Sequence, residues 1–407
     1  MSQEELITTL LGIPGWKVGQ VHFEDEEVVV SIERVEGVGY RCHECGGTFL
    51  FCYDHEAARR VRDFPVWGRR CYLEFSPARV GCSRCGVLVE ALDWIEPNQR
   101  QTQRYEKYVA RLCDMLPVLD VAELEGLDKG TVYRLDRKWL GRREAARPPM
   151  DVRYLGIDEI AVRRGQKYAT VFYDLERREV IALVKGRKQR NVSSLFRRLG
   201  KKFCKGVLAV CMDLWSAYLN SVRRHCKKAA VVFDKFHVYG YLSKAVEEVR
   251  RAEQNKAEEE GKTLIKGARW LLLRKKLGRK QRHTLSEILA LNKNLQKAHI
   301  LKEEFEGFYG SDTREQAEAF LADWTARCEE SGLAPFKKLA KRLRRWKDGI
   351  MAFFAYPITN AFAEGINNTI KVIKRRSYGF HDLGYFFLKI LSVTGALPSL
   401  ETLTHSL

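Results

Sequence analysis

The sequence has no long apolar run and no signal-peptide pattern. No segment approaches the roughly 18 consecutive apolar residues that a membrane-spanning helix needs. This predicts a cytoplasmic protein with no membrane partner. Eleven cysteines in such a chain are better interpreted as metal ligands and buried thiols than as disulfides.

Acidic residues are also scarce relative to basic ones. The 407 residues include 71 Lys and Arg against 52 Asp and Glu, which leaves a formal charge of +19. A surplus of this size favours polyanionic partners, and nucleic acid before a lipid surface. At about 150 residues for a typical domain, the length predicts two to four domains.

Four of the cysteines form two CxxC pairs, each followed by glycine, and we interpret them as the ligands of one structural Zn²⁺: Cys42, Cys45, Cys82 and Cys85. Zinc takes four tetrahedral ligands, and a tight turn brings two thiolates to one metal. The 36 residues between the pairs are long for a minimal zinc ribbon but fit a finger that carries a β-hairpin. The alternative is two accidental pairs.

Three other residues of this region were weighed as ligands. Cys52 and His55 are possible competitors but lack the paired CxxC form. Cys71 alternates with Leu73 and Phe75 as in a strand, so we predict that it belongs to the core.

A helix-turn-helix is predicted after the finger. Apolar residues from Val118 to Leu135 have the spacing of two short helices, Gly126 supplies the turn, and Asp128 can cap the second helix. An ordinary helical hairpin has the same pattern, so the spacing alone does not decide whether this segment binds DNA. The predicted DNA-contacting residues on the outer face are Thr131, Arg134 and Lys138. A basic, proline-terminated linker follows at 141–149.

The next segment has the pattern of an α/β fold. We predict strands at 154–158, 167–174, 179–185, 207–212 and 229–233, with helices at 192–199 and 214–226 and another from Val238. Three antiparallel strands followed by alternating helix and strand is the order of a ribonuclease-H-like fold. The first and fourth strands are neighbours in that fold, so Asp158 and Asp213 should meet.

Three carboxylates are the candidate catalytic residues. Asp158 and Asp213 each end an apolar run, and we expect them at the tips of buried strands. Glu364 stands among Asn360, Gly365, Asn367 and Asn368, poor helix formers that a mere surface helix would not need. Carboxylates gathered in this way can hold divalent metal ions beside a phosphodiester.

Residues 241–356 have only helical spacing and are predicted to be an all-helical insertion. From Pro335 to Arg376 the chain has eleven Lys and Arg residues against two acids. A solvated helix face explains only a few of these bases, so we predict a phosphate-contacting surface. Its residues are Lys341, Arg344 and Arg345, together with Asn368, Lys371 and Arg375 on one face of the helix that carries Glu364.

Four segments resemble the DDE transposases of bacterial insertion sequences, specifically the ISL-three type. They are Gly156-Ile157-Asp158-Glu159, Met212-Asp213-Leu214-Trp215-Ser216-Ala217-Tyr218, Val232-Phe233-Asp234-Lys235-Phe236-His237-Val238, and Glu364-Gly365-Ile366-Asn367-Asn368-Thr369-Ile370-Lys371 with the following Lys374-Arg375-Arg376-Ser377-Tyr378-Gly379-Phe380. The run before Glu364, Thr359-Asn360-Ala361-Phe362-Ala363, departs mildly from the family pattern.

The resemblance implies a catalytic triad of Asp158, Asp213 and Glu364 that binds two Mg²⁺ (or Mn²⁺) ions. It implies strand cleavage at the transposon ends and strand transfer into target DNA. The finger and the helix-turn-helix would recognise the terminal inverted repeats, and a homodimer would bring two ends together in a bacterial, nucleoid-associated setting. Whether the finger contacts DNA or a second protomer is open.

His237 is a further candidate at this site. It either packs in the first turn of a helix that Asp234 caps, or contacts the scissile phosphate or carries a proton. We assign it as catalytic on resemblance to DDE families with a similarly placed Asp–His pair, and interpret Asp234 as mainly structural.

The expected domains are 1–97 (β and zinc finger), 98–147 (helix-turn-helix and linker), 148–240 (first part of the ribonuclease-H-like core), 241–356 (helical insertion) and 357–407 (last part of the core). Two rival functions are weighed against a transposase. One is a ribonuclease-H-like nuclease that cuts without joining, and the other is a DNA-binding regulator derived from a transposase. The presence of all three carboxylates argues against the regulator.

Overall fold

The computed structural model describes residues 3–402 apart from 164–166, 275 and 378. Tyr378, part of a segment quoted above, lies outside the described residues. The chain forms two compact units, one of residues Met1–Arg147 with Leu397–Leu407 and one of Pro148–Ala396. The chain from Leu397 onward therefore groups with the N-terminal unit, whereas the sequence places 357–407 with the catalytic core. No described helix is long and apolar enough to cross a membrane.

The first unit contains a four-stranded sheet with the order β1-β2-β7-β6. Its elements are α1 (Gln3–Leu11), β1 (Trp16–Glu24), β2 (Glu27–Arg34), β6 (Arg59–Val66) and β7 (Arg69–Phe75). Alternate residues of β7, including Cys71, Leu73 and Phe75, are buried in the core of this sheet, as their spacing predicts. The predicted core position of Cys71 is confirmed.

Two small sheets lie in the same unit. Strands β3 (Tyr40–Arg41) and β4 (Thr48–Phe49) form a hairpin, and β5 (Asp54–His55), β8 (Ala78–Cys82) and β9 (Gly86–Val89) form a three-stranded sheet. Each CxxC pair stands in the turn of one hairpin, between β3 and β4 or between β8 and β9.

Three helices complete the first unit: α2 (Gln103–Met115), α3 (Val118–Glu125) and α4 (Lys129–Ala145). Gly126 ends α3 in the left-handed conformation at φ 61°, which glycine adopts without a steric penalty. The Asp128 side chain accepts hydrogen bonds from the amides of Gly130 and Thr131 and caps α4. The predicted turn and cap are confirmed, and α2 packs on α4 as a third helix.

The second unit is built on a five-stranded sheet with the order β12-β11-β10-β13-β14. The strands are β10 (Tyr154–Arg163), β11 (Lys167–Asp174), β12 (Glu179–Lys185), β13 (Ala209–Met212) and β14 (Ala230–Phe233). The first three are antiparallel neighbours, whereas β10, β13 and β14 run parallel. The predicted adjacency of the first and fourth strands is confirmed.

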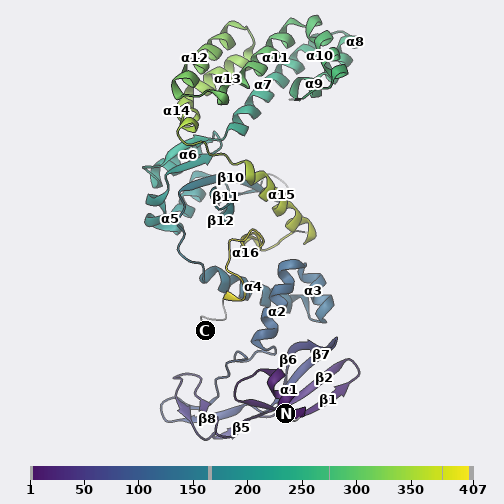
Figure 1. Cartoon of the computed structure of the whole chain (residues 1–407), viewed down its shortest axis with the longest axis vertical. Helices are drawn as coiled ribbons and strands as arrows, with labels where there is room; N and C mark the ends of the chain where they lie inside the picture. Colours follow the sequence, from purple (N-terminus) through teal and green to yellow (C-terminus); the bar gives the residue numbers. More distant parts are fainter. Residues whose placement is uncertain (1–2, 164–166, 275, 378, 403–407) are drawn as a thin grey trace. The chain divides into compact units, whose positions relative to one another are not determined.

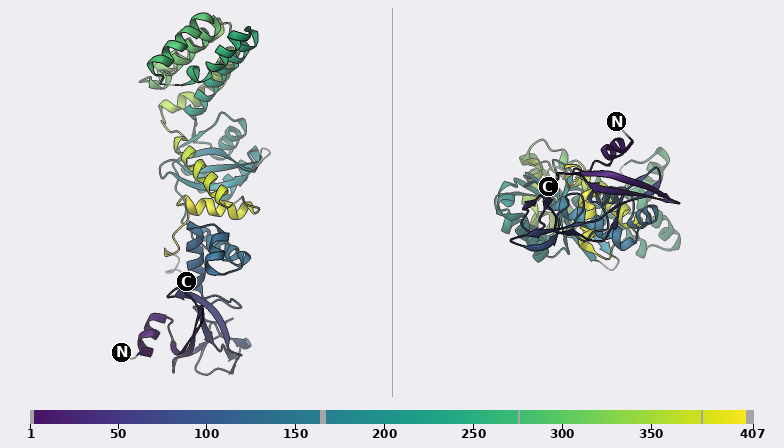
Figure 2. Two further views of the ribbon diagram at one scale, coloured as in Figure 1. Left: turned by 90° about the vertical axis from the view of Figure 1, so that its right-hand side faces the viewer. Right: turned by 90° about the horizontal axis from the view of Figure 1, so that it is seen from below.

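Helices cover both faces of this sheet. Helices α5 (Gln189–Gly206) and α6 (Ser216–His225) pack on the face that carries Leu155, Ile157 and Phe172. Helix α15 (Ala361–Arg376) lies on the opposite face, where an added Cβ on Gly156 would meet Asn360. Helix α16 (Leu383–Val393) contacts β12. Figure 2 shows α15 and α16 in yellow beside the sheet.

Between β14 and α15 the described residues form helices joined by loops, with no strand, as predicted for 241–356. Helix α7 leads from the sheet into this region, shown in green in Figure 1. Its helices are α7 (Lys235–Lys256), α8 (Glu259–Gly267), α9 (Arg269–Leu273), α10 (Arg279–Leu291), α11 (Lys293–Phe305), η1 (Phe308–Gly310), α12 (Arg314–Glu330), α13 (Ala334–Arg345), α14 (Lys347–Met351) and η2 (Ala352–Phe354). The apolar cores of the sheet and the helices form one cluster.

Candidate active site and zinc centre

Asp158 and Asp213 come together because β10 and β13 are parallel neighbours. The register pairs Ile157 with Met212, the residues that immediately precede the two aspartates. Asp213 follows the last residue of β13, as predicted. Asp158 does not end its strand, because β10 continues to Arg163 through antiparallel pairing with β11. Its predicted place at a strand tip is therefore wrong, although it stands where the parallel pairing ends.

His237 completes a three-residue cluster with these carboxylates. One nitrogen or oxygen atom from each of Asp158, Asp213 and His237 lies within 4.8 Å of the other two. Nε2 of His237 is 2.6 Å from Oδ1 of Asp213. The imidazole stands in the first turn of α7, which the buried Asp234 caps by accepting a hydrogen bond from the amide of Phe236. The capping role predicted for Asp234 is confirmed.

Helix α15 is fixed to β10 by two asparagines. Asn360, at the N-cap, is buried and donates to the carbonyl of Ile157. Asn367 donates from Nδ2 to Oδ2 of Asp158 at 3.0 Å, and its Oδ1 accepts from the buried hydroxyl of Tyr173 at 3.0 Å. Because an ionised carboxylate can only accept, the contact with Asp158 turns Nδ2 of Asn367 toward the carboxylate and leaves Oδ1 to accept from Tyr173.

Glu364 lies on α15 one turn before Asn367, and its side chain is exposed. Among the described residues, the group of acidic and imidazole side chains close enough to share an ion contains Asp158, Asp213 and His237, and Glu364 is not part of it. The structure thus brings two of the three predicted carboxylates together and places the third on a helix that contacts one of them.

The electrostatics of the cluster favour a bound cation. Burial raises the pKa of Asp158, the nearby Asp213 raises it further, and hydrogen bonds from Glu159 N–H and Asn367 only partly offset these effects. Burial lowers the pKa of His237, but the contact with Asp213 and the surrounding carboxylates outweigh burial, so that this pKa is raised. Anionic oxygens crowded in a partly buried site are the donors that Mg²⁺ and Mn²⁺ prefer, so these residues fit a divalent ion.

A groove of about 690 Å³ opens beside the carboxylates, between β10 and α15. Its lining includes Glu159, Asn367, Lys371 and Arg375. Lys371 donates to the Asn368 side chain at 3.2 Å, which is the shared helix face predicted for this segment. The groove therefore has an acidic end at Glu159 and a basic, exposed end at Lys371 and Arg375.

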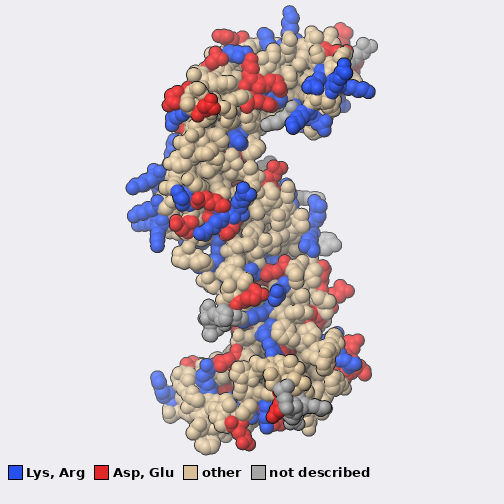
Figure 3. Space-filling view, viewed as in Figure 1, with Lys and Arg blue, Asp and Glu red and all other residues tan. Residues whose placement is uncertain are grey.

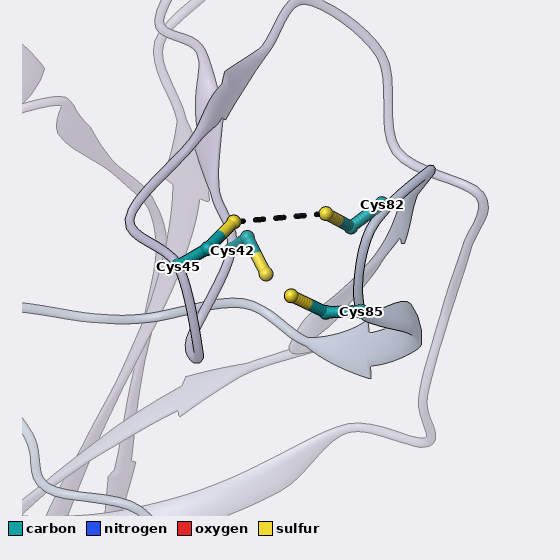
Figure 4. Close-up of side chains that lie close together, drawn as sticks. All are labelled: Cys42, Cys45, Cys82 and Cys85. Atoms are coloured by element: carbon teal, nitrogen blue, oxygen red, sulfur yellow. Dashed lines mark hydrogen bonds between the residues drawn. The ribbon is translucent and has the colours of Figure 1, made fainter.

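The four predicted zinc ligands form a second cluster in the first unit. All four Sγ atoms, from Cys42, Cys45, Cys82 and Cys85, lie within 4.8 Å of one another. The sulfurs point toward a common centre in Figure 4, and the Cys45–Cys82 pair is 3.7 Å apart. Amides of Arg84 and Cys85 donate to Cys82 and, with the neighbouring thiols, lower its pKa to about 7. Four soft sulfur donors in this arrangement are suited to tetrahedral Zn²⁺.

Cys52 and His55, the competing ligands, stand apart from this cluster. Their side chains lie 3.9 Å from each other and are partly exposed. The metal-ligating group found in the described part of the first unit contains neither residue.

The helix-turn-helix places two of its three predicted DNA contacts on an accessible face. Arg134 is exposed and donates to the hydroxyl of Thr131 at 2.9 Å. Lys138 instead lies 2.6 Å from both Glu96 and the buried Glu106. This pairing satisfies a carboxylate in the core of the unit, and the DNA contact of Lys138 stays a prediction.

Two of the three bases of helix α13 that were predicted to contact phosphates also have partners within the protein. Arg344 pairs with Glu329 at 3.0 Å, and the guanidinium of Arg345 lies 5.4 Å from the centre of the Trp346 ring. Lys341 is exposed. The apolar side chains of Phe336, Leu339 and Leu343 on α13 and of Ile350 on α14 are buried.

Sequence reasoning missed two groups beside the aspartates. Glu159 pairs with Arg187 at 2.9 Å, and the Arg187 guanidinium lies 4.3 Å from the ring centre of Tyr168 and 5.5 Å from that of Trp215. Asn367 was noted for its helix propensity and not for its contact with Asp158. Its sequence signal was the position i+3 from Glu364, which shares part of one helix face.

A basic, mixed α/β chain with a carboxylate cluster, a four-thiol centre and a helix-turn-helix has the features of proteins that bind DNA and act on its backbone. A family model described as a transposase, the ISL3 type of DDE transposases, matches residues 155–390. A second, described as the helix-turn-helix domain of transposase family ISL3, matches residues 90–140. The chain belongs to this transposase family.

Two relatives align over nearly the whole chain. The transposase for insertion sequence element IS1001 of Bordetella parapertussis is 33% identical over 400 residues, which cover 96% of this chain and 98% of the relative. The transposase for insertion sequence element IS1557 of Mycobacterium tuberculosis is 24% identical over 435 aligned positions, which cover 98% of each chain.

Proposed function

We propose that this protein is the transposase of a bacterial insertion sequence. It binds the terminal inverted repeats, cleaves DNA strands at the transposon ends with the help of divalent metal ions, and joins the freed 3′-hydroxyl groups to target DNA. The observation that carries the proposal is the meeting of Asp158 and Asp213 on adjacent parallel strands, in a chain of the ISL3 family.

The order of the sheet supports a ribonuclease-H-like catalytic domain. Three antiparallel strands, β12-β11-β10, are followed by the parallel strands β13 and β14 on the other side of β10. The helical region enters this domain after β14 and ends before α15. The helix with the third carboxylate is thereby separated in sequence from the sheet that it contacts.

Asp158, Asp213 and Glu364 would hold the metal ions, two per active site. Bound divalent ions would activate the attacking water or 3′-hydroxyl and stabilise the leaving 3′-oxygen. Glu364 stands one turn before Asn367, which contacts Asp158, so α15 already lies against the carboxylate pair. Its exposed side chain is available to a ligand that enters with the DNA.

The chain's own residues prepare the site. Asn367 donates to Oδ2 of Asp158, the amide of Glu159 donates to its Oδ1 at 2.7 Å, and His237 lies against Oδ1 of Asp213. These contacts fix the orientation of both carboxylates. Because the pKa of His237 is raised, the imidazole holds a proton at Nε2 more readily than a free imidazole does. A cationic His237 would stabilise a phosphate group that reaches the aspartates.

The remaining predicted contacts have a place in the same scheme. Thr131 and Arg134 of the helix-turn-helix would contact the inverted repeat. Asn368, Lys371 and Arg375 would follow the backbone of the strand that enters the groove beside α15. A homodimer would hold the two ends, and Zn²⁺ would stabilise the two hairpins that carry the cysteines.

A strand-joining assay tests the proposal. The purified protein is incubated with a labelled duplex of its own insertion-sequence end, Mg²⁺ and a target plasmid. We expect joining by the wild type and none by Asp158→Ala, Asp213→Ala or Glu364→Ala. Glu315→Ala, which removes an exposed acid from α12, serves as the control and should join normally.

Three other outcomes would contradict parts of the proposal. Tight binding of the end duplex without cleavage, unchanged by the substitutions, would indicate a DNA-binding regulator. Cleavage without joining would indicate a nuclease. Full activity of Glu364→Ala alone would remove Glu364 from the metal site and leave the two aspartates with His237.

A further inference from the structure

The helix pair α5–α6 carries a dense basic surface. Between Arg187 and Lys228 the chain has twelve Lys and Arg residues and a single acid, Asp213. Eleven of these bases have exposed side chains. Ten of them lie within α5 or at the end of α6, and we call these ten the α5–α6 basic face: Arg190, Arg197, Arg198, Lys201, Lys202, Lys205, Arg223, Arg224, Lys227 and Lys228. Figure 3 shows blue side chains gathered at the left-hand edge of the molecule, at the level of α5 and α6 in Figure 1.

The bases of this face lack acidic partners. Within the described residues, none of the ten lies within 4.0 Å of a carboxylate oxygen, whereas Arg344 and Lys347 elsewhere in the unit each pair with a glutamate. Unpaired cations side by side repel one another, and a polyanion removes this repulsion on binding. The face therefore differs from an ordinary solvated surface, in which charges of both signs alternate.

A pocket of about 380 Å³ lies within the face. Arg190 and Arg197 from α5 and Arg224 and His225 from the end of α6 line it. The His225 ring stacks on Phe196 with a centroid distance of 5.5 Å, and its Nε2 is buried without a hydrogen-bond partner among the described residues. Three guanidinium groups and one unsatisfied imidazole nitrogen around this pocket suit the oxygens of a phosphate group.

The face begins beside the candidate active site. Helix α5 starts two residues after Arg187, which pairs with Glu159 next to Asp158. Helix α6 starts three residues after Asp213 and has ten residues, so its far end is about 15 Å from its start at 1.5 Å per residue. Helix α5 is broken at Gly200 (φ 87°), and before this break its bases extend from Arg190 to Arg198 over about 12 Å, the length of some three to four phosphates on one strand of B-DNA.

We propose that the α5–α6 basic face binds the backbone of duplex DNA next to the active site, without sequence preference. Phosphate contacts carry no sequence information directly, which suits target DNA, because a target lacks the inverted repeat. The identification of this duplex as target DNA rests on the proposed function. The binding itself does not depend on strand cleavage.

The test compares two triple variants of the full-length protein. Arg190→Gln/Arg197→Gln/Arg224→Gln neutralises the pocket, and Arg251→Gln/Lys256→Gln/Lys262→Gln removes three bases of α7 and α8 that are each paired with a glutamate. Binding to a mixed-sequence duplex without an inverted repeat is measured by fluorescence anisotropy at several salt concentrations. Circular dichroism and a thermal melt verify that both variants fold.

For the pocket variant we expect about a tenfold loss of affinity for the mixed-sequence duplex. The plot of log K against log salt should become shallower. Its slope should decrease in magnitude by about 0.9 for each lost phosphate contact, hence by up to about 3. The paired-base control should stay within about twofold of the wild type. A second variant of the same face, Lys201→Gln/Lys202→Gln/Lys205→Gln, should show the same loss, and it replaces the pocket variant if that one does not fold.

Equal affinity and equal salt slope for the wild type and both variants of the face would overturn the inference. So would an equal loss in the paired-base control, because net charge alone would then explain the effect. The outcome is independent of the proposed function. A protein that neither cleaves nor joins can still lose duplex affinity in the pocket variant, and an active transposase can keep it.

Discussion

Nδ2 of Asn367 lies 3.0 Å from Oδ2 of Asp158, although 209 positions separate the two residues. This hydrogen bond joins α15 to β10 at the centre of the candidate active site. The hydroxyl of Tyr173 donates to the other end of the same amide, Oδ1 of Asn367, at 3.0 Å. Asn367 is therefore a positioning residue, which acts through the carboxylate it contacts.

Replacement of Asn367 by alanine should slow strand cleavage about 10- to 100-fold, the range known for outer partners of metal ligands. The Mg²⁺ concentration for half-maximal rate should rise, because a loosely held Asp158 binds a cation less well. A Mg²⁺ titration of the cleavage rate measures both effects. Thr369→Ala, a change on the same helix at a residue that bonds only to the Gly365 carbonyl, should leave both values unchanged. An unchanged Mg²⁺ requirement in Asn367→Ala would show that the contact does not position Asp158.

Removal of zinc should unfold part of the first unit. From the sequence we expected loss of structure from about Arg41 to Gly86. The structure narrows this expectation, because β6 and β7 belong to the four-stranded sheet with its own apolar core. Chelation should therefore expose the amides of β3, β4, β5, β8 and β9 to hydrogen exchange and leave those of β1, β2, β6 and β7 protected. Cys82→Ser should lose the metal, whereas Cys52→Ser should keep one zinc per chain. Protection of all nine strands after chelation would contradict the prediction.

Gly349→Ala should destabilise the second unit. A Cβ at this position of α14 would lie 2.4 Å from the ring of Phe233, the last residue of β14. Overpacking of this kind costs about 1–3 kcal/mol, and it should lower the melting temperature. Gly240→Ala on α7 is the matched control, because nothing lies within 4 Å of its added Cβ. That change should stabilise the helix by about 0.5–1 kcal/mol. A stabilising Gly349→Ala would mean that Phe233 moves freely.

Glu247 should contribute stability that is lost in acid. Hydrogen bonds from Arg250 and Arg251 lower its pKa to about 2 from a usual value near 4.5. A lowered folded-state pKa gives stability that is complete above the unfolded value and is lost as the pH falls toward the folded value. Glu247→Gln should therefore cost about 1.5–3 kcal/mol at pH 7, the range for hydrogen bonds to charged groups.

The difference between the wild type and Glu247→Gln should shrink as the pH falls from about 4.5 to about 2. Urea unfolding at several pH values measures it. The neighbouring Glu248, for which the described residues provide no ion pair, gives the control variant Glu248→Gln, which should show little cost at any of these pH values. A cost of Glu247→Gln that persists unchanged at the lowest pH would show that the ion pairs do not carry it.

Local patterns in the sequence predicted much of the fold. The β11–β12 hairpin, the turn at Gly126 and the cap at Asp128 all depend on residues close together in the chain. The four zinc ligands also carry local signals, since each CxxC pair with its glycine is complete within five residues. The end of β10 was misplaced, although Ile160 and Val162 continue the apolar alternation past Asp158 and are buried in the strand that pairs with β11.

Contacts between distant segments could not be predicted from such local patterns. Lys138 meets Glu106 on another helix, and Arg344 meets Glu329 across α12 and α13, so bases counted as free are paired. The α5–α6 basic face escaped notice for the opposite reason. Its bases belong to two helices separated by the apolar strand β13, and they form one surface only when those helices pack together.

The chain passes between its two compact units twice, once at Arg147–Pro148 and again at Ala396–Leu397. The C-terminal segment from Leu397 is anchored to the first unit, since Arg143 donates to the carbonyl of Pro398 and Leu400 packs beside the buried Trp139. A proteolytic nick at Arg147–Pro148 would leave residues 1–147 attached to the rest of the chain only through the non-covalent contacts of this C-terminal segment. Recombination that exchanges the DNA-recognition module between related elements must therefore transfer two separate gene segments, or lose the stabilising tail.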